Sequence, residues 1–149
     1  MQNSQFLMPQ FSYMIATLDR IIHKHLDKSL KKVGLTLPQF TALSVLHDKK
    51  HISNAKLAEL SFIRPQSANK ILQELQQNGW INKLPDPEHG RRLLIELTPA
   101  GQEILQQGNV CLTQLEEKMT TGMNIHMAFL VRDNLRLLLN NLRTLPLHD

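Results

Sequence analysis

The sequence predicts a mainly α-helical chain that carries one small β-hairpin. Apolar residues recur at every third or fourth position through most of the 149 residues, which is typical of helices with one buried face. The exception is the stretch 80–97, where two strand-length apolar segments flank a turn rich in Pro, Gly and charge. We therefore expect helices on both sides of a single hairpin.

The composition is that of a soluble domain of ordinary size. Apolar residues make up 42% of the chain, and no apolar run is long enough to span a bilayer. The first residues lack the basic and apolar regions of a signal peptide, and the lone Cys111 cannot form an intrachain disulfide. We expect one domain over residues 1–149, located in the cytoplasm, with no membrane partner.

The first predicted helix, 11–30, has apolar residues at three- and four-residue spacing from Phe11 to Leu26. Gly34 ends it. Thr36 and Gln39 then have the spacing of a capping box, in which each side chain accepts a hydrogen bond from the backbone of the other residue. A second helix, 38–47, should follow and bury Phe40, Leu43 and Leu46.

Two short helices come next. Ser53 has the side chain of an N-cap for a helix that ends at Leu60, with Ile52, Leu57 and Leu60 facing inward. Pro65 suits the first turn of another helix, which runs to Gln77 before Asn78 and Gly79 stop it. The pair has the proportions of a helix-turn-helix, in which the second helix is the recognition helix.

The hairpin follows directly, with strands expected at 80–84 and 92–97. Its tip, 85–91, is polar and dense in turn-forming residues. Thr98 and Pro99 are a second helix-start signal, which opens a long helix to about residue 120. Thr121 and Gly122 interrupt it, and a last helix is expected at 123–142.

The predicted recognition helix 65–77 has two contrasting faces. Ala68, Ile71, Leu72 and Leu75 form an apolar stripe that should pack on the preceding helices. The residues that we expect to contact DNA from this region are Arg64, Gln66, Ser67, Asn69, Lys70 and Gln73. Asn and Gln can pair bidentately with adenine, Ser can contact a base or a phosphate, and Lys can meet guanine or a phosphate. Glu74 is the first carboxylate on this face.

The hairpin tip adds Arg91 and Arg92, which are placed where a wing contacts the flanking DNA backbone or the minor groove. Asp86 and Glu88 can pair with these arginines, so we expect the net attraction of the wing for DNA to be modest. The formal net charge of +4 is in keeping with a polyanionic partner. The sequence thus predicts a winged helix-turn-helix that binds double-stranded DNA.

Several segments resemble the MarR family of bacterial regulators. These are Leu35 to Phe40, Lys56 to Leu60, Leu75 to Ile81, and Arg91 to Gly101. The resemblance implies a winged helix-turn-helix over 35–101 within a single MarR-like domain. The family commonly has an aspartate where this chain has His89, so the wing is expected to be held differently. A solvated histidine is the simpler interpretation of His89.

The terminal segments are richly apolar but lie outside the DNA-binding part, so something must cover them. The resemblance implies that the segments 6–33 and 102–145 interleave across a twofold axis as dimerisation helices. A homodimer then matches a palindromic operator. The alternative is a monomer whose ends pack on the DNA-binding part. The resemblance also implies a repressor that responds to a small, frequently aromatic effector.

Other functions are less well supported by the residues. There is no phosphate loop, nucleophile motif or carboxylate pair, so we expect no enzyme and no cofactor. A winged-helix protein–protein interaction module remains an alternative, although its exposed helix face would be apolar or acidic. Scattered histidines such as His23, His25, His47 and His51 leave a metal sensor open, and Cys111 leaves a redox sensor open.

Overall fold

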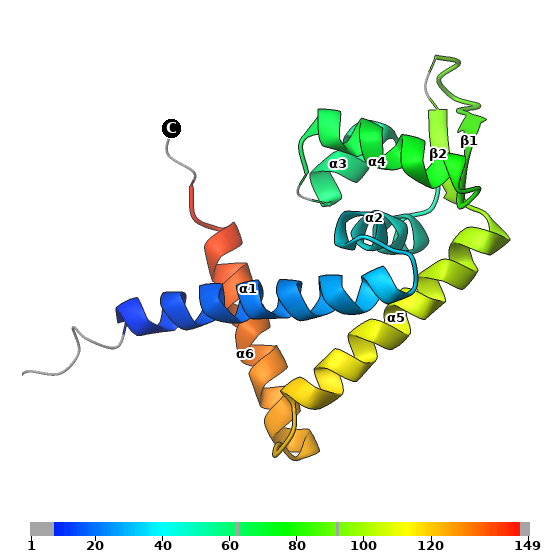
Figure 1. Cartoon of the computed structure of the whole chain (residues 1–149). Coiled ribbons are helices and arrows are strands. Elements are labelled where there is room, and N and C mark those ends of the chain that lie inside the picture. The colour runs from blue at the N-terminus through cyan, green and yellow to red at the C-terminus, as the bar shows by residue number, and fades with distance from the viewer. Residues whose placement is uncertain (1–7, 62, 92, 147–149) are drawn as a thin grey trace, which may run out of the picture. The chain divides into compact units, whose positions relative to one another are not determined.

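The computed structural model describes residues 8–61, 63–91 and 93–146, and the order of its elements is the one expected from the sequence (Figure 1). The elements are α1 (Met8–Lys32), α2 (Leu37–Asp48), α3 (Asn54–Leu60), α4 (Pro65–Gln77), β1 (Ile81–Pro85), β2 (Leu93–Leu97), α5 (Pro99–Met119) and α6 (Ile125–Arg143). The chain divides into two compact units at residue 115. The predicted fold class, mainly α with a small β-wing, is confirmed.

Helix α1 is buried only near its carboxyl-terminal end. Leu26 and Leu30 enter the core of the first unit. The large apolar side chains nearer the amino-terminal end are exposed, and these are Phe11, Tyr13, Met14, Ile15, Leu18 and Ile21. The helix ends before Gly34, whose φ of 83° is readily adopted by glycine. The apolar face that the periodicity predicts therefore lies uncovered in the single chain.

The start of α2 is held by the predicted capping box. The hydroxyl of Thr36 accepts a hydrogen bond from the Gln39 backbone N–H at 3.3 Å, and Gln39 Oε1 accepts one from the Thr36 N–H at 3.0 Å. Phe40, Leu43 and Leu46 are buried as expected. Helix α2 therefore contributes to the centre of the core.

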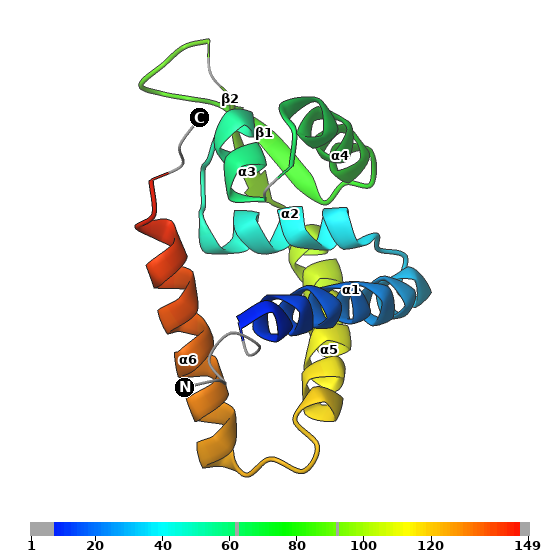
Figure 2. The same cartoon turned by 90° about the vertical axis from the view of Figure 1, so that its left-hand side faces the viewer.

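Helices α3 and α4 lie on the same side of α2 in both views (Figures 1 and 2). Ser53 is the N-cap of α3 and accepts a hydrogen bond from the Lys56 N–H at 3.3 Å. Helix α4 has the predicted bounds, and its whole predicted apolar stripe is buried, namely Ala68, Ile71, Leu72 and Leu75. This burial sets which side of α4 faces outward.

The wing is a two-stranded antiparallel sheet in which Ile81 pairs with Leu97 and Pro85 pairs with Leu93. The strands begin one residue later than predicted. A further bridge joins Ile52 to β2, because the Ile95 N–H donates to the Ile52 carbonyl at 3.1 Å. The side-chain pattern predicts only an inward-facing Ile52, and a single backbone pairing leaves no periodicity by which to detect it.

The junction of the wing and α5 is organised by Thr98. Its hydroxyl donates to the Gly79 carbonyl at 2.7 Å and accepts a hydrogen bond from the Gly101 N–H at 3.0 Å. A Cβ at Gly101 would lie 2.0 Å from the carbonyl oxygen of Trp80. The close approach between the first turn of α5 and the base of the wing thus requires glycine at this position.

The second unit, from residue 116, contains the end of α5 and all of α6. Asn124 caps α6 by accepting a hydrogen bond from the Met127 N–H at 2.9 Å, so the helix begins slightly later than predicted. None of the residues of α6 is buried in the single chain. No helix in the described ranges is long and apolar enough to cross a membrane.

Candidate nucleic-acid interface

The outward face of α4 carries the side chains that the sequence predicts to contact DNA. Arg64, Gln66, Ser67, Asn69, Lys70 and Gln73 are all exposed. They lie opposite the buried stripe of the same helix, which packs on α2 and α3. The face therefore offers amide, hydroxyl and cationic groups, which are the groups that contact base edges and phosphates.

Asn69 has a side-chain partner that the sequence does not reveal. Asn54, the first residue of α3, donates a hydrogen bond from its side-chain Nδ2 to Asn69 Oδ1. Bidentate pairing with adenine needs both the oxygen and the nitrogen of an asparagine amide. In this structure, Asn54 occupies one of the two lone pairs of the Asn69 oxygen, so bidentate pairing with adenine would require that oxygen to accept a second hydrogen bond.

Glu74 differs from its predicted position on the exposed face, because it is half-buried. Its Oε2 accepts a hydrogen bond of 2.9 Å from Gln39 Nε2, and Gln39 is itself buried. The bond joins residues 35 positions apart in the chain, so helical periodicity could not reveal it. The carboxylate is directed towards α2, which leaves the exposed face of α4 without an acidic group.

The wing presents Arg91 as an exposed side chain, whereas Arg92 lies outside the described residues. Asp86 is buried, and its Oδ1 accepts a hydrogen bond from the Glu88 N–H at 2.9 Å. Asp86 therefore helps to shape the turn of the wing. His89 is exposed at the tip, in keeping with a solvated histidine.

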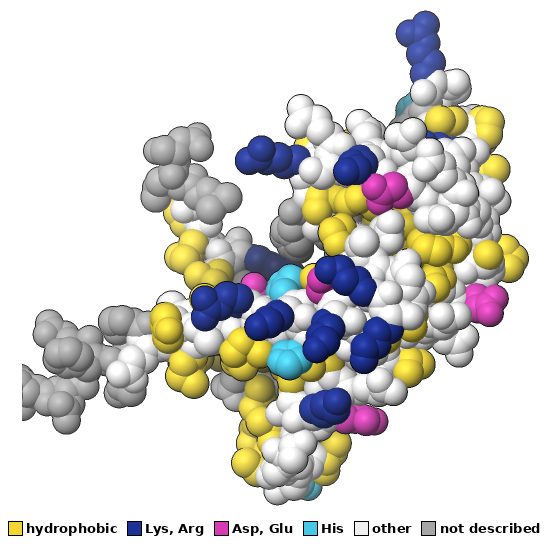
Figure 3. Space-filling model, viewed as in Figure 1, with side chains coloured by type: hydrophobic (Ala, Val, Ile, Leu, Met, Phe, Trp, Pro, Cys, Tyr) yellow, Lys and Arg dark blue, Asp and Glu magenta, His cyan; other side chains and the backbone are white. Residues whose placement is uncertain are grey.

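Basic residues also gather outside the recognition helix. On the face drawn in Figure 3, Lys and Arg side chains gather along the carboxyl-terminal half of α1. This helix carries Arg20, Lys24, Lys28, Lys31 and Lys32. Asp27 Oδ2 lies 2.6 Å from Lys31 Nζ, and this ion pair offsets part of the positive charge of α1. The net positive charge is therefore not confined to the predicted DNA-binding surface.

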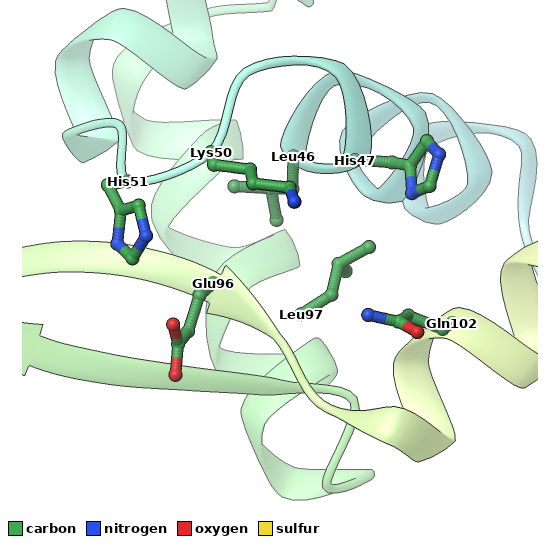
Figure 4. A pocket seen from close by; sticks show the side chains of 7 residues that line it. All are labelled: Leu46, His47, Lys50, His51, Glu96, Leu97 and Gln102. Atoms are coloured by element: carbon green, nitrogen blue, oxygen red, sulfur yellow. The ribbon is translucent and has the colours of Figure 1, made fainter.

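A polar pocket of about 220 Å³ lies between the end of α2, strand β2 and the start of α5 (Figure 4). Leu46 and Leu97 contribute its apolar surface. The remaining lining side chains are His47, Lys50, His51, Glu96 and Gln102. His51 has a φ of 59°, which is uncommon for a residue with a side chain.

The histidines and Cys111, which left a metal sensor and a redox sensor open, gain little support for these functions from the structure. Within the described ranges, no three His, Cys, Asp or Glu side chains are grouped so as to hold a metal ion. Cys111 is a buried part of the core of the first unit, as expected for a small apolar residue.

A recognition helix with a polar and cationic outer face, a supporting helix before it and a two-stranded wing after it define the class of winged helix-turn-helix transcriptional regulators. The MarR family model matches residues 35–93, which span α2 to the start of β2. The chain is thus a winged helix-turn-helix transcriptional regulator whose residues 35–93 match the MarR family.

Two curated relatives illustrate the degree of similarity. The HTH-type transcriptional repressor Rv2887 of Mycobacterium tuberculosis is 24% identical over 107 residues, which cover 72% of this chain and 77% of that protein. The multiple antibiotic resistance protein MarR of Escherichia coli is 26% identical over 117 residues, which cover 73% of this chain and 81% of that protein.

Solved structures share the fold along most of the chain. A MarR family transcription regulator matches with a TM-score of 0.78 and 22% identity, covering 94% of this chain and 95% of that one. A mutant MarR from Escherichia coli complexed with operator DNA matches with a TM-score of 0.77 and 19% identity, covering 93% and 99%. BpsR of Bordetella bronchiseptica is a protein whose DNA binding is regulated by 6-hydroxynicotinic acid. Its structure matches with a TM-score of 0.74 and 19% identity, covering 87% of this chain and 98% of that one.

Proposed function

We propose that the chain is a transcriptional repressor that binds a palindromic operator in double-stranded DNA as a homodimer. The observation that carries the proposal is the exposed face of α4, where every predicted DNA-contacting side chain reaches solvent and the one carboxylate of the helix is held by Gln39. Operator binding by the MarR of Escherichia coli supports the same kind of partner for this chain.

The contacts divide by chemistry. Gln66, Ser67, Asn69 and Gln73 are assigned to base edges in the major groove, and Arg64 and Lys70 to phosphates or guanine. Arg91 and Arg92 of the wing are assigned to the flanking backbone or the minor groove. In this scheme residues 35–101 bind DNA, and residues 6–33 and 102–145 form the dimer, all within one MarR-like domain that acts in the cytoplasm.

The homodimer is supported by apolar surface that the single chain leaves exposed. On α1, Phe11, Met14, Ile15, Leu18 and Ile21 are exposed. On α6, Phe129, Leu130, Leu135, Leu139 and Leu142 are exposed. Apolar surface of this extent on two helices is typical of an interface. Because a twofold axis would place two recognition helices in one complex, the matching site is a palindrome.

A small aromatic effector completes the proposal. BpsR supports it, since the DNA binding of that protein is regulated by 6-hydroxynicotinic acid. An effector that binds only the folded protein raises its thermal midpoint, and the rise grows with the logarithm of effector concentration once the site is largely occupied. A thermal-shift screen of small aromatic acids, followed by DNA binding in the presence of each hit, tests this part of the proposal.

The decisive experiment is DNA binding by the purified protein to the region upstream of its own gene. Affinity is measured at several salt concentrations, with a scrambled duplex of equal length as the control. We expect specific, salt-sensitive binding with two protomers on each site. Equal and weak binding to both duplexes would instead favour the protein–protein interaction module, for which the next experiment is capture of a partner by the exposed face of α4.

A further inference from the structure

Gln39 is a buried side chain that serves two elements at once. Its Oε1 accepts the Thr36 N–H at 3.0 Å, which completes the capping box of α2. Its Nε2 donates to Glu74 Oε2 at 2.9 Å, which joins α2 to the recognition helix. Gln39 is only 8% exposed, so water cannot easily replace either bond.

The second bond explains why the residue is glutamine. A capping box accepts Glu or Gln at this position, because each has an oxygen that can receive the N-cap N–H. Only Gln also has a donor. A glutamate here would face the Glu74 carboxylate, and two carboxylates in a half-buried contact repel each other. The amide is therefore required by Glu74 and not by the cap.

Glu74 is the single acidic residue of α4. It lies next to Gln73, which is one of the exposed side chains assigned to DNA. A carboxylate on that face would repel phosphate. The bond to Gln39 holds it on the side of α4 that meets α2, and it adds to the buried apolar stripe in fixing how the helix is rotated on its support.

We propose that Gln39 is a positioning residue for DNA recognition. Through Glu74 it reinforces the rotation of the recognition helix that the buried apolar stripe sets, and it keeps this carboxylate away from the DNA-facing surface. The inference rests on the proposed function for its effect on DNA. Its other part, that the bond between Gln39 and Glu74 stabilises the position of α4, can be measured without DNA.

The test is an exchange of the two side chains between their positions. Gln39→Glu places two carboxylates in contact while keeping a competent capping box. The double variant Gln39→Glu with Glu74→Gln restores one amide and one carboxylate in reversed order. Ala100→Glu, at an exposed site in the first turn of α5 that lies outside the assigned DNA contacts and the proposed dimer segments, is the control that adds one negative charge elsewhere.

Two measurements are made on each variant. The first is affinity for a duplex selected by the wild-type protein from a random library, compared with a scrambled duplex. The second is amide hydrogen exchange in the segment 65–77 without DNA. We expect Gln39→Glu to lose about tenfold in affinity for the selected duplex, and less for the scrambled one, while exchange in α4 becomes faster.

The double variant should recover to within about threefold of wild type in both measurements, because the coupling of neighbours is not additive. The inference is overturned if the double variant is as impaired as Gln39→Glu, or if Gln39→Glu behaves like Ala100→Glu. If selection enriches no sequence at all, the proposed function fails, and hydrogen exchange alone then decides whether this pair holds α4.

Discussion

Asn69 shows how one contact changes the chemistry that a residue offers to DNA. As an isolated amide it could pair bidentately with adenine. In the structure Asn54 already donates to its oxygen, which leaves that oxygen one lone pair, so the N–H donors of Asn69 become the better-suited groups for a contact with DNA. Donors suit the O6 and N7 of guanine, the O4 of thymine, or a phosphate. The identity of the exposed residue is therefore insufficient to predict the base that it prefers.

Removing Asn54 should alter base preference more than affinity. In Asn54→Ala, the Asn69 oxygen is released and can accept a hydrogen bond from adenine, which shifts discrimination at one operator position by about 1–3 kcal/mol. The measurement is selection from a random DNA library with wild type and variant in parallel. Asn109→Ala, at an exposed site on α5, is the control. An unchanged preference would show that Asn69 does not contact that base.

Lys70 should contribute to DNA affinity through its charge and not through recognition of the base sequence. Lys70→Ala is expected to weaken operator binding by about tenfold and to reduce the slope of log affinity against log salt by about 0.9, as for one lost phosphate contact. Affinities at four or more salt concentrations measure the slope. Lys118→Ala, near the end of α5, is the matched control. A slope equal to that of wild type would remove Lys70 from the contacts.

At the scale of elements, α5 approaches its neighbours at two glycines. A Cβ at Gly108 would lie 2.5 Å from the ring of Phe40, and one at Gly101 would lie 2.0 Å from the Trp80 carbonyl oxygen. The first obstacle is a side chain and the second is backbone. Because backbone yields less readily, a side chain at position 101 is tolerated less well than one at position 108.

Gly101→Ala should therefore destabilise the protein although alanine favours helices. The gain in helix propensity is at most about 1 kcal/mol, whereas relieving the contact with Trp80 should cost more, for a net loss of about 2 kcal/mol. Urea unfolding measures the change. Gly90→Ala in the wing is the control, since a Cβ there meets no atom within 4 Å. Equal stability of both variants would contradict the argument.

At the scale of the whole molecule, the two units differ in how they are stabilised. The first contains the buried core, which draws on α1 to α5 and both strands. In the second, none of the residues of α6 is buried. A helix with this many exposed apolar side chains gains little stability alone, because packing of an apolar face supplies most of helical stability in proteins. The proposed partner is a second copy of the chain.

Leu18→Glu tests that assembly. Leu18 lies in the exposed apolar face of α1, and a charge buried in an apolar interface should weaken dimerisation by at least about a hundredfold. Sedimentation over a range of protein concentrations measures the dissociation constant. Ala16→Glu, on the opposite face of the helix, is the control. A dimer as stable as wild type would show that this face of α1 lies outside the interface.

Much of the fold and of the candidate interface follows from the sequence by local rules. The capping box of Thr36 and Gln39, the start of α4 at Pro65 and the buried apolar stripe of α4 depend on spacing within a few residues, which periodicity and capping preferences describe. The exposed face of α4 follows from its buried face in the same way.

The tertiary structure alone decided the contacts between distant segments. Gln39 with Glu74, Asn54 with Asn69, and Ile52 with Ile95 each join residues on different elements. Side-chain periodicity describes one element at a time, so it carries no information on which polar groups meet across a packed interface. The sequence by itself determined the helix-turn-helix and the exposed polar face of α4, and packing determined which polar groups on that face are already hydrogen-bonded.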